Sequence, residues 1–160
     1  MQHDRGVRFA LLLLILCSCA LPTRGVHVVS TPTYVAPPAP SSAPIAIPEA
    51  RQLALDYARA QSGKPYCWGG AGPGCFDCSG LVSEAWQRAG ITLPRTSEAI
   101  RGSLPEVSWL EARPGDILWW PGHVGLYAGE GRVLDAGRAG GQVRERPLWG
   151  LPRVLRPIAI

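Results

Sequence analysis

The sequence lacks several features that would each direct it to a particular class of protein. Its unbroken apolar run covers only residues 9–16, far fewer than the ~20 residues of a membrane-spanning helix. Its formal net charge is only +4, which is too small to indicate nucleic-acid binding, so no nucleic-acid partner is expected. No internal repeat is visible, and the 19 Gly and 16 Pro residues follow no period, which excludes a collagen-like chain.

What is present is a globular composition, with 46% hydrophobic and 18% charged residues in 160, enough for one domain of ordinary size. The prolines concentrate in residues 21–48, where Ser, Thr and Ala fill most other positions. Because proline blocks both helices and sheet ladders, this segment is expected to be an extended, flexible tether. Residues 49–160 are expected to form the folded domain, and the protein is expected to be a monomer.

Residues 1–20 have the pattern of a secretory signal peptide, because Arg5 and Arg8 precede the apolar run and small residues follow it. Two kinds of processing stay open. Ser18-Cys19-Ala20 suits ordinary cleavage after Ala20, whereas Leu16-Cys17-Ser18-Cys19 resembles a bacterial lipobox that would place a lipid on Cys19. The protein is expected to be exported to the cell envelope, and lipidation of Cys19 would attach it to a membrane.

The expected elements are helices first and strands after. Apolar residues recur at helical spacing in residues 49–61 and 78–89, and a short helix is expected around residues 97–102. Short segments separated by Gly and Pro then predict four strands, at residues 116–120, 123–128, 132–136 and 142–146. Helices followed by an antiparallel meander predict an α+β fold class.

Cys78 is the first candidate for chemistry. It lies at the expected start of a helix, after a Gly-rich loop, where unpaired N–H groups and the helix dipole lower the pKa of a thiol. Ser79-Gly80 beside it adds little bulk, so a substrate carbonyl could approach the thiolate. A lone cysteine is more often a buried structural residue, and a partner is needed to decide between these interpretations.

His123 is the candidate partner. Strand alternation places it on one face with Gly125 and Tyr127. A hairpin that turns at Gly129 would pair His123 directly with Asp135, whose carboxylate could fix the imidazole tautomer and stabilise the imidazolium. Nucleophile, base and orienting group would then be present. The alternative is a surface histidine and an aspartate that flanks a turn.

Four motifs in this order and spacing carry a family resemblance. They are Pro65-Tyr66-Cys67-Trp68-Gly69-Gly70 with Asp77-Cys78-Ser79-Gly80-Leu81, then Leu93-Pro94-Arg95-Thr96-Ser97, Pro114-Gly115-Asp116-Ile117-Leu118, and Gly122-His123-Val124-Gly125-Leu126-Tyr127. Together they resemble the NlpC-type cell-wall endopeptidases, papain-like cysteine peptidases of bacterial envelopes. The resemblance covers about residues 50–148, and it implies helices packed on a small antiparallel sheet.

The resemblance implies a role for each matching residue. Cys78 would be the nucleophile and His123 the base. Asp135 falls at the third catalytic position, where the family more often has His, Glu, Gln or Asn. Tyr66 would help to form the oxyanion hole together with the Cys78 backbone N–H, and such donors stabilise acyl transfer.

The resemblance also implies a substrate. Asp77 and Ser79 match positions that in some relatives meet the free amine of a stem peptide. The implied substrates are peptidoglycan stem peptides, cut between D-γ-glutamate and a diamino acid, and neither a cofactor nor a metal is expected.

Cys67 and Cys75 depart from the family's commonest pattern, which has apolar or small residues there. In an exported protein, two cysteines that flank a short loop suggest a disulfide. Such a bridge would leave Cys78 as the free thiol of the domain, and it would hold Tyr66 and Trp68 beside the nucleophile.

Three other functions stay open from the sequence. Cys75-Phe76-Asp77-Cys78 has the C-x-x-C spacing of thioredoxin-like redox proteins, although no βαβ pattern surrounds it. The cysteines at 67, 75 and 78 could ligate zinc together with His123, although the paired spacing of structural zinc sites is lacking. A weak or inactive wall-binding module is the third alternative, should the aspartate at the third position impair catalysis.

Overall fold

The computed structural model describes residues 46–137 and 141–158. The predicted signal peptide, the lipidation site at Cys19 and nearly all of the predicted tether lie outside these residues. Within the described ranges, no helix is long and apolar enough to cross a membrane. The helices are α1 (Ile47–Ala60), α2 (Cys78–Arg88), α3 (Ser97–Ser103) and the 3-10 helix η1 (Trp109–Glu111). The strands are β1 (Glu106–Val107), β2 (Ile117–Trp120), β3 (His123–Gly129), β4 (Arg132–Gly137), β5 (Gln142–Pro147) and β6 (Arg153–Leu155).

Helices α1 and α2 pack against each other and form the N-terminal part of the domain. Helix α1 begins at Ile47, two residues before the predicted start. Pro48 is tolerated in its first turn because a backbone N–H at that position has no acceptor within the helix. Helix α2 begins at Cys78 as predicted. It ends before Gly90, whose φ of +84° suits the left-handed residue that follows a helix.

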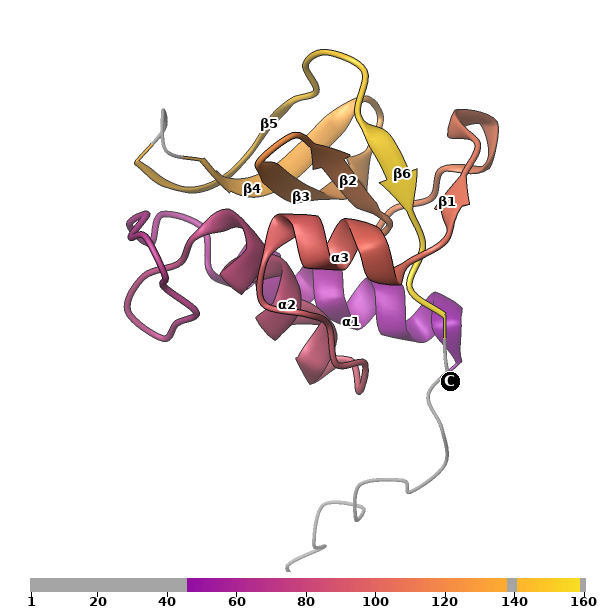
Figure 1. Ribbon diagram of the computed structural model, residues 1–160. Coiled ribbons are helices and arrows are strands. Elements are labelled where there is room, and N and C mark those ends of the chain that lie inside the picture. Colours follow the sequence, from indigo (N-terminus) through magenta and orange to yellow (C-terminus); the bar gives the residue numbers. More distant parts are fainter. Residues whose placement is uncertain (1–45, 138–140, 159–160) are drawn as a thin grey trace, which may run out of the picture. The chain divides into compact units, whose positions relative to one another are not determined.

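The strands of the described residues form one antiparallel sheet in the order β1-β6-β2-β3-β4-β5. Figure 1 shows α1, α2 and α3 together on one side of this sheet. The predicted α+β fold class is therefore confirmed. The sequence predicted β2 to β5 but missed β1 and β6, because strands of two and three residues are too short to show alternation.

The hydrophobic core lies between the helices and the sheet. Trp86 of α2 is fully buried, as are Ile117, Leu126 and Leu134 of the sheet. Burial of side chains of this size contributes about 1.5–3 kcal/mol each. This packing fixes α2 against β3 and β4, so the residue at the start of α2 is held beside the start of β3.

The hairpin of β3 and β4 has a different register from the predicted one. The observed pairs are Leu126–Leu134, Tyr127–Val133 and Gly129–Arg132, with a bulge between Tyr127 and Gly129. Asp135 therefore lies beside Gly125 rather than directly opposite His123. The prediction was wrong because the chain turns at Glu130 and Gly131 rather than at Gly129, and the bulge then shifts the pairing by one residue. The shift is by an even number of residues, so Asp135 and His123 still share a face.

Candidate active site

Asp77 caps helix α2 and so fixes the position of Cys78. One carboxylate oxygen accepts the Gly80 N–H (2.6 Å), as an N-cap side chain does, and the other accepts the Gly69 N–H (2.9 Å). A Cβ atom on Gly80 would clash with the carbonyl oxygen of Gly70, so glycine at this position lets the Gly-rich loop pack onto the helix. Cys78 therefore occupies the first turn of α2.

Cys78 is the free cysteine of the described residues, and it is half-buried. Burial would raise the pKa of its thiol, but hydrogen bonds with the His123 side chain and the Val124 backbone N–H lower the pKa further than burial raises it. The thiolate, which is the nucleophilic form, is therefore favoured at lower pH than in a free cysteine.

His123 begins β3, directly after the turn at Gly122, whose φ is +75°. Its Nε2 lies 2.7 Å from Oδ2 of Asp135, which leaves Nδ1 for the hydrogen bond with Cys78. Burial lowers the pKa of His123, but the hydrogen bonds with Asp135 and Cys78 raise it to about 9. Glu98 of α3 accepts the Gly122 N–H (2.9 Å) and thereby ties this turn to the helical layer.

Asp135 is fully buried in β4 and reaches His123 diagonally across the hairpin. Gly125 lies beside it in β3, and a Cβ atom there would come within 3.1 Å of the Asp135 Cβ. The missing side chain at Gly125 leaves room for the diagonal contact. The structure thus places Cys78, His123 and Asp135 in one line of hydrogen bonds, by a different route from the directly opposed pair of the prediction.

Sequence analysis missed Arg146, which lies on β5. Its Nε donates to Oδ1 of Asp135 (3.0 Å) and its Nη2 donates to Oδ2 (2.6 Å). Burial would raise the pKa of Asp135, but the bonds from His123 and Arg146 keep it below its ordinary value. The available signal was chemical, because a carboxylate buried in a sheet needs a cationic or hydrogen-bonding partner.

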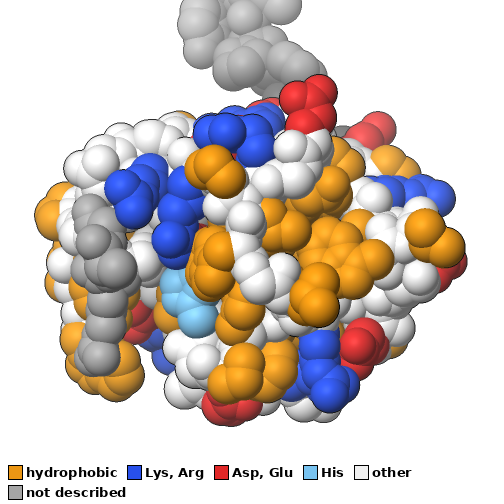
Figure 2. All heavy atoms as spheres, turned by 90° about the horizontal axis from the view of Figure 1, so that it is seen from above, with side chains coloured by type: hydrophobic (Ala, Val, Ile, Leu, Met, Phe, Trp, Pro, Cys, Tyr) orange, Lys and Arg blue, Asp and Glu red, His pale blue; other side chains and the backbone are white. Residues whose placement is uncertain are grey.

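A pocket of about 400 Å³ opens at Cys78 and His123. Its lining comes from the Gly-rich loop, the start of α2, the segment before α3 and the turn before β3: Tyr66, Trp68, Gly69, Asp77, Cys78, Ser79, Arg95, Thr96, Ser97, Gly122 and His123. On the face shown in Figure 2, a histidine side chain reaches the surface among hydrophobic and basic side chains. Asp135 is not among the lining residues, so it contacts the pocket only through His123.

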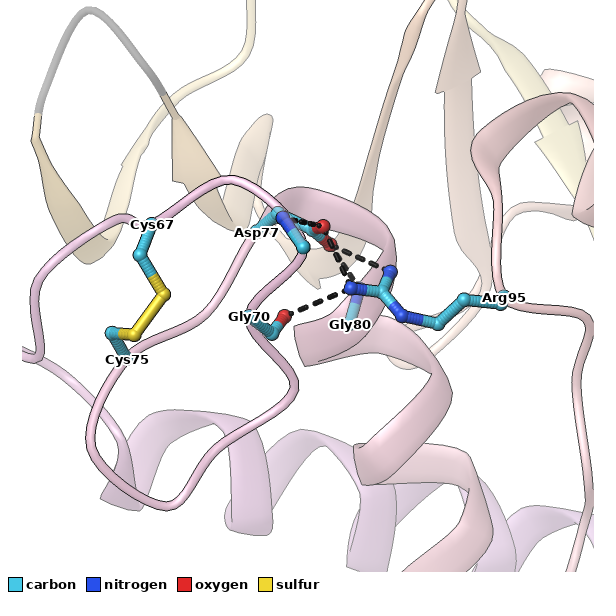
Figure 3. The surroundings of a disulfide bond; sticks show 7 residues. Cys67, Gly70, Cys75, Asp77, Gly80 and Arg95 are labelled. Carbon is cyan, nitrogen blue, oxygen red and sulfur yellow. Dashed lines mark hydrogen bonds and ion pairs between the residues drawn. A yellow bond between two sulfur atoms is a disulfide. The ribbon is translucent and has the colours of Figure 1, made fainter.

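One wall of the pocket is an ion pair. Arg95 donates to both carboxylate oxygens of Asp77 (2.9 and 2.7 Å) and to the Ser79 hydroxyl (3.0 Å). It also reaches the Gly70 carbonyl (3.2 Å; Figure 3). Asp77 and Ser79, which were predicted to bind an amine, therefore both already contact the Arg95 guanidinium. Arg95 belongs to one of the four sequence motifs, but no role was predicted for it.

A disulfide joins Cys67 and Cys75, whose Cα atoms are 5.7 Å apart (Figure 3). A Cβ atom on Gly70 would clash with the Cys67 sulfur, so the bridge packs directly on this glycine. The Gly70 carbonyl in turn accepts the Asp77 N–H (2.9 Å). The disulfide thus supports the start of α2 through Gly70 and Asp77.

The same bridge removes two of the alternatives left open by the sequence. A thioredoxin-like site would pair Cys75 with Cys78, but Cys75 is bonded to Cys67. A zinc site of three cysteines and one histidine would need the thiolates of Cys67 and Cys75, and sulfur atoms in a disulfide are not thiolates. Cys78 is left to act with His123.

Replacing Cys67 and Cys75 together by serine is expected to lower the free energy of unfolding by about 2–3 kcal/mol, because the bridge closes a short loop in the unfolded chain. Denaturant unfolding of the double variant and the parent measures this difference. In exported protein, alkylation without reductant followed by mass spectrometry should modify Cys78 as the sole domain cysteine. Alkylation of Cys67 and Cys75 as well would contradict the bridge.

Comparison with known proteins agrees with the motifs. The profile described as the NlpC/P60 family matches residues 63–150, which is more than half of the chain. The matched region contains the disulfide loop, Cys78, His123, Asp135 and Arg146. The chain belongs to the NlpC/P60 family. The resemblance inferred from the four motifs is thereby confirmed.

Curated relatives of this NlpC/P60 domain include proteins named as endopeptidases. A probable endopeptidase of Corynebacterium glutamicum is 37% identical over 140 residues, which are 86% of this chain and 63% of that protein. The bifunctional muramidase/DL-endopeptidase CwlT of Bacillus subtilis is 43% identical over 87 residues, which are 49% of this chain and 26% of that protein. The chain therefore spans less than two thirds of the length of these relatives.

Solved structures of the family share the fold. The peptidoglycan hydrolase RipB of Mycobacterium tuberculosis has a TM-score of 0.64 and 33% identity, covering 71% of this chain and 67% of that one. RipD of the same organism, described as a non-catalytic NlpC/p60 domain protein adapted to peptidoglycan binding, has a TM-score of 0.60 and 28% identity, covering 68% and 98%. These neighbours confirm the predicted papain-like arrangement of helices on an antiparallel sheet.

Proposed function

We propose that this protein is a cysteine endopeptidase that hydrolyses peptidoglycan stem peptides in cell-wall remodelling. The observation that carries the proposal is the hydrogen-bonded line of Cys78, His123 and Asp135 at the pocket. A nucleophile, a base and a group that orients the base are the parts that acyl transfer requires. Relatives named as endopeptidases and peptidoglycan hydrolases support a peptidase and this class of substrate.

The geometry supports a two-step acyl transfer. The Cys78 thiolate attacks the peptide carbonyl carbon, and the carbonyl electrons move to oxygen. As this intermediate collapses, the C–N bond breaks and the His123 imidazolium gives its proton to the leaving amine. Neutral His123 then takes a proton from water, whose oxygen attacks the thioester. Collapse releases the new carboxyl group and restores the thiolate and the imidazolium.

We assign Tyr66 to the oxyanion hole, with the Cys78 backbone N–H as the second donor. Tyr66 lines the pocket with Cys78. Its backbone N–H donates to the Gly141 carbonyl (2.7 Å), and it forms a bridge with Phe76. These contacts anchor the backbone of Tyr66, and its side chain is partly buried against the hydrophobic core. A phenol on such an anchored residue needs little reorganisation when charge develops on the substrate oxygen.

The bond that we propose is the one between D-γ-glutamate and the diamino acid. Asp77, Ser79 and Arg95 form a wall that carries both an anion and a cation. A γ-linked glutamate keeps its own α-carboxylate, and a short stem peptide keeps a free amine, so the substrate offers a group for each charge. Because Arg95 already contacts Asp77, an amine would meet the ion pair rather than a bare carboxylate.

We also propose that the protein acts outside the cytoplasm, in the cell envelope. The predicted signal peptide in residues 1–20 and the relatives that are peptidoglycan hydrolases support this location. Lipidation of Cys19 would hold the domain at a membrane, whereas cleavage after Ala20 would release it.

A wall-binding module with little catalysis is the second candidate, because the structurally similar RipD is described as non-catalytic. The hydrogen bond between Cys78 and His123 favours the enzyme. Incubation with purified peptidoglycan, followed by mass spectrometry of the soluble products, separates the two functions. An endopeptidase releases peptides with a new diamino acid amine, whereas a binding module sediments with the wall and releases nothing.

Replacing Asp135 by asparagine is expected to lower the rate of peptide cleavage about tenfold, and replacing it by alanine about a hundredfold, because alanine removes the orienting group altogether. The asparagine variant would lack the negative charge that raises the pKa of His123, so the alkaline limb of activity should move below pH 9. Cleavage rates from pH 5 to 9 measure both effects. The matched control is Asp56→Asn on the exposed face of α1. If Asp135→Ala cleaves as fast as the parent at every pH, Asp135 has no catalytic role and the catalytic unit is a dyad of Cys78 and His123.

A further inference from the structure

We propose that Arg146 is a positioning residue for catalysis, which holds the Asp135 carboxylate in the orientation that His123 needs. The proposal rests on the proposed function, since it concerns the same hydrogen-bonded line. Arg146 and Asp135 lie on neighbouring strands, β5 and β4. Two N–H groups of the guanidinium donate to the two oxygens of the carboxylate. The distances are 3.0 Å from Nε to Oδ1 and 2.6 Å from Nη2 to Oδ2.

The bidentate contact determines which way the carboxylate faces. Oδ2 of Asp135 lies 2.7 Å from Nε2 of His123 and also accepts from Arg146. With only His123 as a partner, the buried carboxylate could rotate and leave one oxygen without a donor, which is unfavourable. Two parallel bonds from a planar guanidinium remove this freedom. Arg146 therefore orients the His123 ring indirectly, by fixing the plane of the Asp135 carboxylate that contacts it.

Aromatic side chains fix Arg146 in turn. Its guanidinium carbon lies 3.8 Å from the ring centre of Trp149. Trp149 also stacks on Trp120, with 4.2 Å between the ring centres and 3° between the planes, and the Trp120 indole N–H donates to the Trp149 carbonyl (3.1 Å). Both indoles lie 5.7 Å from the His123 ring. Arg146 is thus part of a packed layer beside the imidazole, not a free surface cation.

The Arg146–Asp135 pair is also closely packed by its neighbours. A Cβ atom on Gly137 would come within 3.1 Å of Arg146 Nη2 and 3.3 Å of Asp135 Oδ2. Arg146 is not among the described residues that line the pocket. A side chain that fits Asp135 closely and lies outside the pocket should affect the rate of the chemical step and leave substrate binding unchanged.

Steady-state cleavage of a synthetic stem peptide by Arg146→Met tests this inference. We expect kcat to fall about tenfold while KM stays within about twofold, because the variant loses orientation of the base and no substrate contact. Arg146→Lys keeps the positive charge but loses the planar guanidinium, so its kcat should lie between that of Arg146→Met and that of the parent. In an Asp135→Asn background, Arg146→Met should lower kcat by less than about twofold, since the carboxylate that Arg146 orients is absent.

The control is Arg132→Met, which removes an arginine of the same hairpin that pairs with Glu145 (2.8 Å); it should keep the parental kcat. Circular dichroism and thermal unfolding verify that each variant is folded. Parental kcat for folded Arg146→Met, a loss confined to KM, or an equal loss in the Asp135→Asn background would overturn the inference. A parent whose rate equals that of Cys78→Ala would instead refute the proposed function, so the two failures are distinguishable.

Discussion

Replacing Cys78 by alanine should lower peptide hydrolysis by at least about a thousandfold while the domain stays folded. The covalent route begins at this thiolate, and no other free cysteine lies in the described residues. Loss of a nucleophile removes both steps of acyl transfer, which accounts for an effect of this size. The fold should persist, because Asp77 and the disulfide loop hold the start of α2 without the thiol.

Release of peptides from purified peptidoglycan, followed by mass spectrometry, measures the Cys78→Ala effect. Gln87→Ala is the matched control, because Gln87 is exposed on the same helix and does not line the pocket. Binding of the Cys78→Ala protein to sedimented wall should be retained, since the pocket keeps its shape. Parental turnover by this variant would refute the nucleophile assignment, and absence of turnover in the parent would favour the binding module.

Local features account for what the sequence predicted correctly. The position of Cys78 at the start of α2 followed from the Gly-rich loop before it and the helical spacing of the apolar residues after it. The strand that begins at His123 followed from alternation over a few residues. Signals of this kind need no knowledge of which segments meet in space.

Non-local pairing accounts for what the sequence missed. Strand β1 exists because residues 106–107 pair with residues 154–155 of β6, and β6 pairs in addition with β2, so both strands depend on segments far apart in the chain. The partner of Asp135 was found despite a wrong register, because a shift by two residues keeps both side chains on one face. Arg146 could not be placed, since its contact depends on the register of β4 with β5.

Replacing His123 by alanine should lower hydrolysis by about a thousandfold or more, an effect similar in size to that of Cys78→Ala. His123 supplies the proton for the leaving amine and later takes one from water. It also lowers the pKa of Cys78 by hydrogen bonding. Without it, only the Val124 N–H is left to oppose the effect of burial, so the pKa of the thiol should rise and less thiolate should form near neutral pH.

The pH dependence separates these two contributions. In the parent, activity should rise as pH passes the lowered pKa of Cys78 and fall as pH passes about 9, where the His123 imidazolium loses its proton. The rate of Cys78 alkylation at pH 6 reports the thiolate directly, and it should drop in His123→Ala because a smaller fraction of the thiol is then ionised. His27→Ala, in the Pro-rich segment, is the matched histidine control. If His123→Ala alkylates as fast as the parent at pH 6, the imidazole does not stabilise the thiolate, and His123 acts only in proton transfer.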